Sequence, residues 1–215
     1  DVDKANEDGY TPLYTAAQKG KVHVADALVK AGADVDKANE DGYTPLYVAA
    51  HEGQVHVVDA LIKGGADVDK ADKYGYTPLY GAAQEGMVDV AGALMKAGAD
   101  MDKANEDGYT PLFWTAYQGM VDATLALIEA GADVDKANED GYTPLYLAAQ
   151  EGMVDVADAL VKAGADVDKA NKDGRTPLHV AAYRGMADVA VALIKGGADV
   201  EKADKFGRTP LYLAA

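Results

Sequence analysis

A segment of fourteen residues, 34–47, returns along this chain at a constant interval. It reads Asp-Val-Asp-Lys-Ala-Asn-Glu-Asp-Gly-Tyr-Thr-Pro-Leu-Tyr, and near-copies begin at Asp1, Asp67, Asp100, Asp133, Asp166 and Asp199. The step between consecutive copies is 33 residues. A fixed period of about 20–50 residues is typical of repeat proteins, whose units bury their apolar faces only by stacking on their neighbours. The sequence therefore predicts a repeat solenoid.

The second copy, residues 34–66, carries the start and stop signals of two short helices. Thr44 is expected to cap the first helix with its hydroxyl, and Pro45 follows at the first helical position, where its missing N–H costs nothing. Gly53 is expected to end this helix in the left-handed conformation. A second helix is predicted from about residue 54 to 63. The Asp, Asn and Gly residues between successive helix pairs predict a projecting β-turn, which we call a finger.

The order of these signals resembles one known family. The motif Asp-Gly-Tyr-Thr-Pro-Leu-Tyr is followed by Ala-Ala, then by Gly, then by Ala-Leu-Val-Lys-Ala-Gly-Ala-Asp-Val, and this pattern is similar to the ankyrin repeat over the whole chain. The resemblance implies an all-α solenoid with a helix-turn-helix and a β-turn finger in each repeat. It also implies one domain, 1–215, made of repeats 1–33, 34–66, 67–99, 100–132, 133–165, 166–198 and the partial repeat 199–215.

The resemblance raises one doubt about the contacts between neighbouring loops. Ankyrin repeats usually have His after Thr-Pro-Leu, and this His ties neighbouring loops together. Only His179 keeps it in this chain, so the usual hydrogen bond is in question elsewhere. The other copies have an aromatic residue there: Tyr14, Tyr47, Tyr80, Phe113, Tyr146 and Tyr212.

Composition excludes several classes of function. The net charge of −16 argues against a nucleic-acid partner, because phosphate binding needs a basic face. No apolar run is long enough to span a bilayer, so no membrane partner is expected. The chain has no cysteine, which excludes disulfides and thiolate chemistry. It also lacks serine, which indicates copying of a short parent unit, either by tandem duplication or by human design.

No set of residues predicts catalysis, a metal or a cofactor. Serine and cysteine are absent, and each threonine of a Thr-Pro-Leu motif is assigned to a helix cap. The carboxylates repeat on exposed turns, without a pocket that would shift a pKa. His23, His51 and His56 are best interpreted as surface residues, because stacked repeats lie about 10 Å apart, whereas zinc needs its ligands about 2 Å away. The chain is therefore not expected to be an enzyme.

The surface formed by the finger tips, the finger bases and the exposed ends of the first helices is the candidate binding site. Tyr and Arg are enriched there, as they are at the hot spots of protein interfaces. Alternatively, the tyrosines pack ring on ring and only stiffen the fingers. The predicted partner-binding residues are Tyr43, Tyr74, Tyr76, Gln84, Tyr109, Tyr117, Tyr142, Gln150, Arg175 and Tyr183.

Repeat 4 is the most divergent copy and contains the only tryptophan, Trp114. One hypothesis is that Trp114 fills the volume that Gly81 leaves in the same slot of the preceding repeat. The alternative is that Phe113, Trp114 and Tyr117 form an exposed hot spot. We favour packing for Trp114 and surface exposure for Tyr117.

These observations favour a non-catalytic, cytoplasmic scaffold that binds a protein on the concave side of the solenoid. A structural or engineered array without a specific partner is one alternative, and a targeting domain of a larger protein is another. Because no polar capping repeat is visible at either end, we expect either that the chain is part of a longer array or that it associates end to end.

Overall fold

A computed structural model describes residues 1–215, and it contains thirteen α-helices and no strand. The chain divides into two compact units, Asp1–Glu106 and Asp107–Ala215, which are described separately here. The organisation as one domain therefore stays a prediction. None of the helices has the length and apolar character that crossing a membrane requires.

Each unit is built from pairs of short helices. The first unit contains α1 (Pro12–Gln18), α2 (Val22–Lys30), α3 (Pro45–His51), α4 (Val55–Lys63), α5 (Pro78–Gln84) and α6 (Val88–Lys96). The second unit contains α7 (Pro111–Gln118), α8 (Val121–Ala130), α9 (Pro144–Glu151), α10 (Val154–Lys162), α11 (Pro177–Arg184), α12 (Ala187–Lys195) and α13 (Pro210–Ala214).

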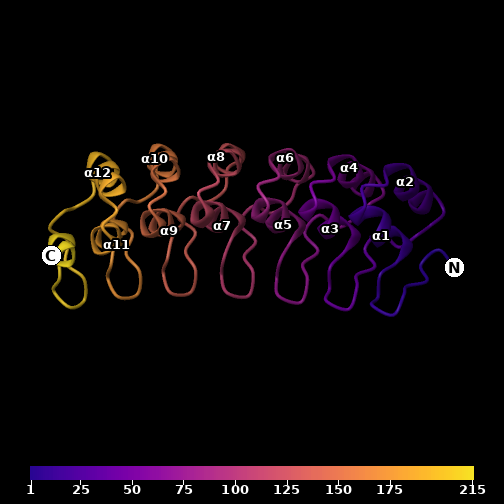
Figure 1. Cartoon of the computed structure of the whole chain (residues 1–215), viewed down its shortest axis with the longest axis horizontal. Coiled ribbons are helices and arrows are strands. Elements are labelled where there is room, and N and C mark those ends of the chain that lie inside the picture. Colours follow the sequence, from indigo (N-terminus) through magenta and orange to yellow (C-terminus); the bar gives the residue numbers. More distant parts are fainter. The chain divides into compact units, whose positions relative to one another are not determined.

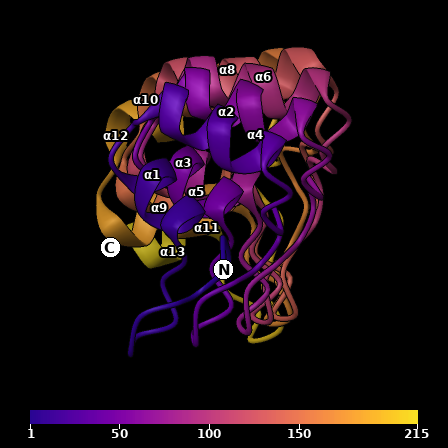
Figure 2. The same cartoon turned by 90° about the vertical axis from the view of Figure 1, so that its right-hand side faces the viewer.

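Within each unit the odd-numbered helices lie in one row and the even-numbered helices in another (Figure 1). The fingers extend from the odd-numbered row, on the side away from the even-numbered helices (Figure 2). Neighbouring helices in a row contact each other, as α3 does with both α1 and α5. The predicted pattern of two helices and one finger per repeat is therefore confirmed.

The helix boundaries follow the predicted signals. The hydroxyl of Thr44 accepts a hydrogen bond from the backbone N–H of Tyr47 at 3.0 Å, and Pro45 is the first helical residue. The same cap is present in front of every odd-numbered helix. Gly53 has φ +69° after α3, as predicted, because glycine has no Cβ to clash in this conformation.

The core of each unit lies between the two rows of helices. In repeat 2, Leu46 and Leu61 are fully buried and supply the bulk, while the fully buried Ala49 and Ala50 keep α3 close to its neighbours. In repeat 5, Leu145 and Leu160 occupy the corresponding positions. A buried leucine of this kind contributes about 2–5 kcal/mol relative to alanine.

The motif Asp-Val-Asp-Lys ties neighbouring fingers together within each unit. Asp67 donates its backbone N–H to the Asp36 carboxylate at 3.1 Å, and Lys70 Nζ donates to the Asp36 backbone carbonyl at 3.0 Å. In the second unit Lys169 makes the same bond to the Asp135 backbone carbonyl at 2.8 Å. The repetition of this motif therefore has a structural cause.

Candidate binding surface

Seven side chains surround a hollow of about 410 Å³ in the second unit. Tyr109 and Tyr142 come from two finger bases, and the remainder come from the facing sides of α7 and α9. We call this site the aromatic hollow, and its lining residues are Tyr109, Phe113, Trp114, Tyr117, Tyr142, Leu147 and Gln150. It joins four of the predicted partner-binding residues: Tyr109, Tyr117, Tyr142 and Gln150.

The rings of the aromatic hollow support one another. The rings of Tyr109 and Phe113 are stacked, with centroids 4.6 Å apart and planes 20° apart. Trp114 and Tyr117 lie one helical turn apart on α7, and their rings make a tilted contact at 5.8 Å. Because Phe113 is buried and Tyr117 is 38 % exposed, the rings are held by the core at one end and face solvent at the other.

Trp114 is half-buried and lines the aromatic hollow. Tyr117 is exposed, as predicted. A Cβ atom added to Gly81 would lie 3.3 Å from the ring of Tyr47, so Tyr47 bounds the space beside this glycine. Gly81 and Trp114 belong to different units, and their complementarity stays a prediction.

The tyrosines of the finger bases stack on the first helix of their own repeat. Tyr43 stacks on Tyr47 with a centroid distance of 4.6 Å, and Tyr76 contacts Tyr80 at 4.7 Å. Burial raises the pKa of Tyr146, whose ring contacts that of Tyr142, to about 12. These pairs support a stiffening role, while the finger-base rings remain half-exposed.

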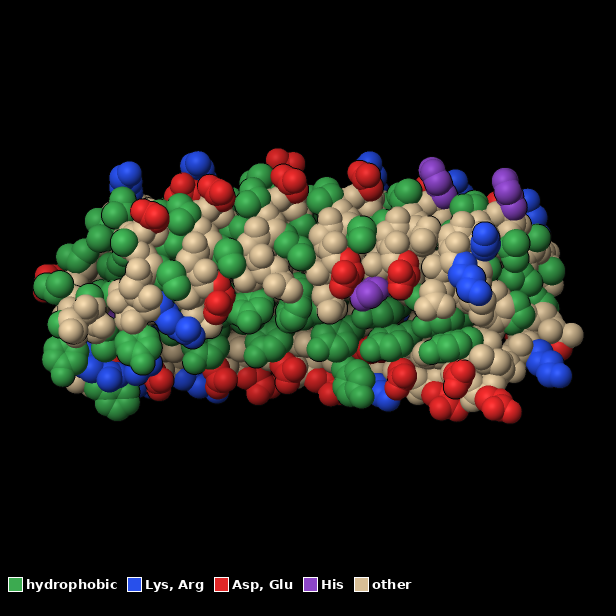
Figure 3. Space-filling view, in the orientation of Figure 1, with side chains coloured by type: hydrophobic (Ala, Val, Ile, Leu, Met, Phe, Trp, Pro, Cys, Tyr) green, Lys and Arg blue, Asp and Glu red, His purple; other side chains and the backbone are tan.

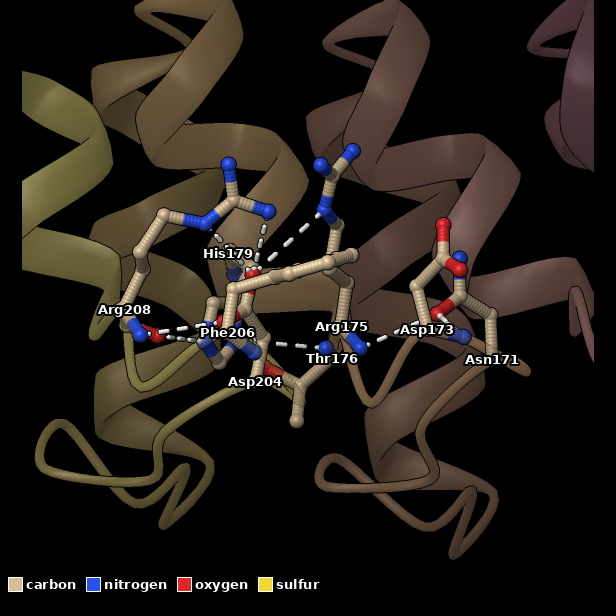
Figure 4. A network of polar contacts seen from close by, with 8 residues as sticks. All are labelled: Asn171, Asp173, Arg175, Thr176, His179, Asp204, Phe206 and Arg208. Carbon is tan, nitrogen blue, oxygen red and sulfur yellow. Dashed lines mark hydrogen bonds and ion pairs between the residues drawn. The ribbon is translucent and has the colours of Figure 1, made fainter.

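The other predicted partner-binding residues lie outside the aromatic hollow. Tyr74 is 47 % exposed at the tip of its finger, where the Nζ atom of Lys73 lies 5.1 Å from the centre of its ring. Gln84 is half-buried near the end of α5. Tyr183 is 68 % exposed on α11. Arg175 points to Asp204, so it takes part in a polar network (Figure 4).

Asp204 is the centre of this network. Its Oδ1 atom accepts from the backbone N–H groups of Phe206 and Arg208 at 2.9 and 3.0 Å. Its Oδ2 atom accepts from Arg208 Nε at 2.9 Å, and Arg175 Nε lies 3.7 Å away. Burial by itself would raise the pKa of Asp204, but the hydrogen bonds from Arg208 outweigh it and hold this pKa well below its usual range. The carboxylate is therefore charged and fully paired.

His179 links this network to α11. Its Nε2 atom lies 3.0 Å from the backbone carbonyl of Arg208, which only accepts hydrogen bonds, so Nε2 carries the proton. Its Nδ1 atom accepts from the backbone N–H of Thr176 at 3.2 Å. Burial lowers the pKa of His179. The predicted tie between loops is therefore present at His179.

The surface around the aromatic hollow combines apolar and acidic side chains. A band of hydrophobic side chains crosses the finger bases within each unit, and acidic side chains border it on the fingers (Figure 3). No group of three His, Cys, Asp or Glu side chains is placed to hold a metal ion. Sequence reasoning missed Leu147 as a lining residue, although its place in the slot of Trp114 one repeat later was a usable signal.

The family model described as ankyrin repeats (3 copies) matches residues 1–72, 28–105, 79–171 and 163–215. The structure is similar to the crystal structure of the human ASB11 ankyrin repeat domain, with a TM-score of 0.84 and 28 % identity, over 96 % of this chain and 92 % of that one. It is also similar to the ankyrin repeat domain of Bcl-3, a member of the IkappaB protein family, with a TM-score of 0.90, 29 % identity and coverage of 97 % and 96 %. No curated protein matches the chain in sequence.

Proposed function

The chain belongs to the ankyrin repeat family, and on that premise we propose that it is a non-catalytic scaffold that binds a protein partner on the concave face of fingers and odd-numbered helices. The aromatic hollow is the observation that supports this proposal. Aromatic side chains with one buried and one exposed end bury a large area at little entropic cost, and they dominate the energetics of protein interfaces.

The charge around the aromatic hollow limits the kind of partner. The net charge is −16, and acidic side chains border the apolar band on the fingers (Figure 3). A partner that presents an apolar or aromatic side chain flanked by basic residues would match both features. Nucleic acid and membrane surfaces match neither, and a cytoplasmic location stays a prediction.

Peptide display on the purified chain tests this proposal. The affinity of peptides selected from a random library is then measured by fluorescence anisotropy for the wild type and for the Tyr117→Ala and Tyr142→Ala variants. We expect a loss of affinity of about tenfold or more, because each change removes an exposed ring from the aromatic hollow. Leu125→Ala is the matched control, since Leu125 is exposed to the same 38 % on α8, in the other row of helices.

Two results would contradict the proposal. One is a set of peptides whose affinity falls with Leu125→Ala but not with either tyrosine variant. The other is the failure of every library to yield a peptide that wild type binds more tightly than the tyrosine variants. The second result would favour the alternative of a structural or engineered array without a specific partner. A targeting domain of a larger protein would bind peptides in the same way, so this assay does not distinguish a targeting role from a scaffold role.

End-to-end self-association is proposed for the apolar surface at α13. Leu211 is 78 % exposed and Ile194 is 50 % exposed, beside an apolar hollow of about 460 Å³ that also contacts Met186. A second copy of the chain would cover this surface. Sedimentation equilibrium should show association that Leu211→Glu abolishes, and a monomer at all concentrations would exclude it.

A further inference from the structure

The carboxylate of Asp72 is buried with one oxygen unpaired. Asp72 is 9 % exposed, and its Oδ1 atom accepts from the backbone N–H groups of Tyr74 and Tyr76, each at 2.8 Å. Its Oδ2 atom is buried and has no hydrogen-bond partner. A buried polar atom without a partner is costly, and more so when it carries charge. The chain therefore provides no donor for this oxygen.

The fold of the finger does not require a charge at this position. Five repeats have asparagine in the same place: Asn6, Asn39, Asn105, Asn138 and Asn171. In repeat 2, Asn39 Oδ1 accepts from the N–H groups of Asp41 and Tyr43 at 3.1 and 2.9 Å, so one neutral oxygen is enough to hold the turn. The second oxygen of Asp72 thus adds negative charge and no bond.

The second unit contains the same position with its charge paired. Asp204 stands four repeats after Asp72, and its Oδ2 atom lies 2.7 Å from Arg208 Nη2 and 2.9 Å from Arg208 Nε (Figure 4). Arg208 also lies 4.6 Å from the centre of the Phe206 ring. In the first unit the finger-base positions equivalent to Arg175 and Arg208 hold Tyr43 and Tyr76. At Asp204, where the second carboxylate oxygen is paired, its partner is therefore a guanidinium group.

No cation of the first unit takes this place. The adjacent Lys73 forms an ion pair with Asp41, and its Nζ atom lies over the ring of Tyr74. A Cβ atom added to Gly42 would lie 3.1 Å from Asp72 Cα, so Asp72 packs against the residue that precedes Tyr43. Burial, and after it the charge of Asp72, raises the pKa of Tyr43. Tyr43 and Tyr76 are both half-exposed at the finger bases.

We propose that Asp72 receives the guanidinium group of an arginine side chain from a protein partner, between the rings of Tyr43 and Tyr76. A guanidinium offers a planar fork of donors to the carboxylate and stacks on aromatic faces, whereas an ammonium does neither as well. This inference names the chemistry that the finger bases select and goes beyond the aromatic hollow. Because its test needs no protein partner, its failure would leave the proposal for the aromatic hollow untouched.

The first test supplies the arginine from within the chain. Tyr76→Arg places an arginine where Arg208 stands relative to Asp204, and we expect the melting temperature to rise by about 2–4 °C. Tyr10→Arg is the matched control, since the same change lies beside the neutral Asn6. A rise with Tyr76→Arg alone supports the proposal, and equal shifts in the two variants, or no rise with Tyr76→Arg, would overturn it.

The second test measures binding of a small probe to the full chain. N-acetyl-arginine amide is titrated while the backbone N–H signals of Tyr74 and Tyr76, which donate to Asp72, are followed by NMR. We expect the signals to shift saturably as the probe binds, and the neutral citrulline analogue to bind with about tenfold lower affinity. Asp72→Asn and Tyr76→Arg should show no shift. Asp41→Asn removes the same charge from an exposed site and should retain binding. Equal binding of the lysine analogue, or unchanged binding to Asp72→Asn, would refute the assignment.

Discussion

Two buried threonines of repeat 4 form a hydrogen bond. The loss of stability on removing this bond should depend on which threonine is changed. Thr124 on α8 donates its hydroxyl to Thr115 Oγ1 on α7 at 3.0 Å, and Thr115 donates to the backbone carbonyl of Leu112 at 3.1 Å. Both threonines are fully buried. The equivalent positions of repeat 5 are Ala148 and Ala157, so the pair is particular to repeat 4.

Valine has the shape of threonine without the hydroxyl, so valine variants isolate the hydrogen bonds. Thr115→Val leaves the Thr124 hydroxyl buried without its acceptor, and we expect a loss of about 1–3 kcal/mol in the free energy of unfolding. Thr124→Val leaves the bond from Thr115 to Leu112 intact, and the expected loss is about 0.5–1.5 kcal/mol. Changing both should cost less than Thr115→Val alone, because no hydroxyl is then stranded.

Urea unfolding followed by the fluorescence of Trp114 measures these changes, because Trp114 is the only tryptophan and lies in the same repeat. Circular dichroism gives the unfolding of the whole chain in the same samples. Thr15→Val is the control, since Thr15 occupies a half-buried position in repeat 1, and it should leave stability within about 0.5 kcal/mol. Losses that simply add in the double variant would refute the hydrogen bond as the source of the coupling.

Two further predictions follow from single positions. Gly92→Ala should stabilise the chain by about 1 kcal/mol in urea unfolding, because a Cβ at this helical position meets no atom within 4 Å; a loss of stability would contradict the open space described there. Burial lowers the pKa of His179, so the unfolded chain takes up the proton more readily, and stability should fall as the pH drops below about 6.5. His179→Tyr, the residue found in five other repeats, should flatten the dependence of the urea midpoint between pH 5 and 7.5, and an unchanged slope would assign that dependence to other groups.

The helices could be predicted from the sequence because their signals are local. A cap at Thr44 and a stop at Gly53 act within a few residues, and they bound α3, Pro45–His51. The second helix, predicted from about residue 54 to 63, is observed as α4, Val55–Lys63. Because the period is 33 residues throughout, the helices predicted for one repeat could be assigned to the equivalent residues of the others. Its regular length also indicated which positions stack on one another.

The contacts between side chains of different segments could not be predicted in the same way. The bond between Thr124 and Thr115 depends on how closely α8 approaches α7, and the bond from Lys70 to Asp36 depends on the spacing of two fingers. Trp114 was expected either in the core or on the surface, whereas it is half-buried and lines the aromatic hollow. These outcomes depend on distances of a few ångströms that composition and period do not specify.

In Asp72 and Asp204, one carboxylate oxygen holds the turn of the finger and the other is free to serve a different role. One oxygen of each residue holds the turn, as asparagine does elsewhere, so the second oxygen is not constrained by the fold. Two arginines near Asp204 pair that oxygen within the chain, whereas tyrosines at the equivalent positions near Asp72 leave it unpaired. Because the backbone of the two fingers makes the same hydrogen bonds, only the finger-base residues decide whether the charge stabilises the chain or is left for a partner. Exchanging Tyr76 for arginine therefore alters binding without altering the turn.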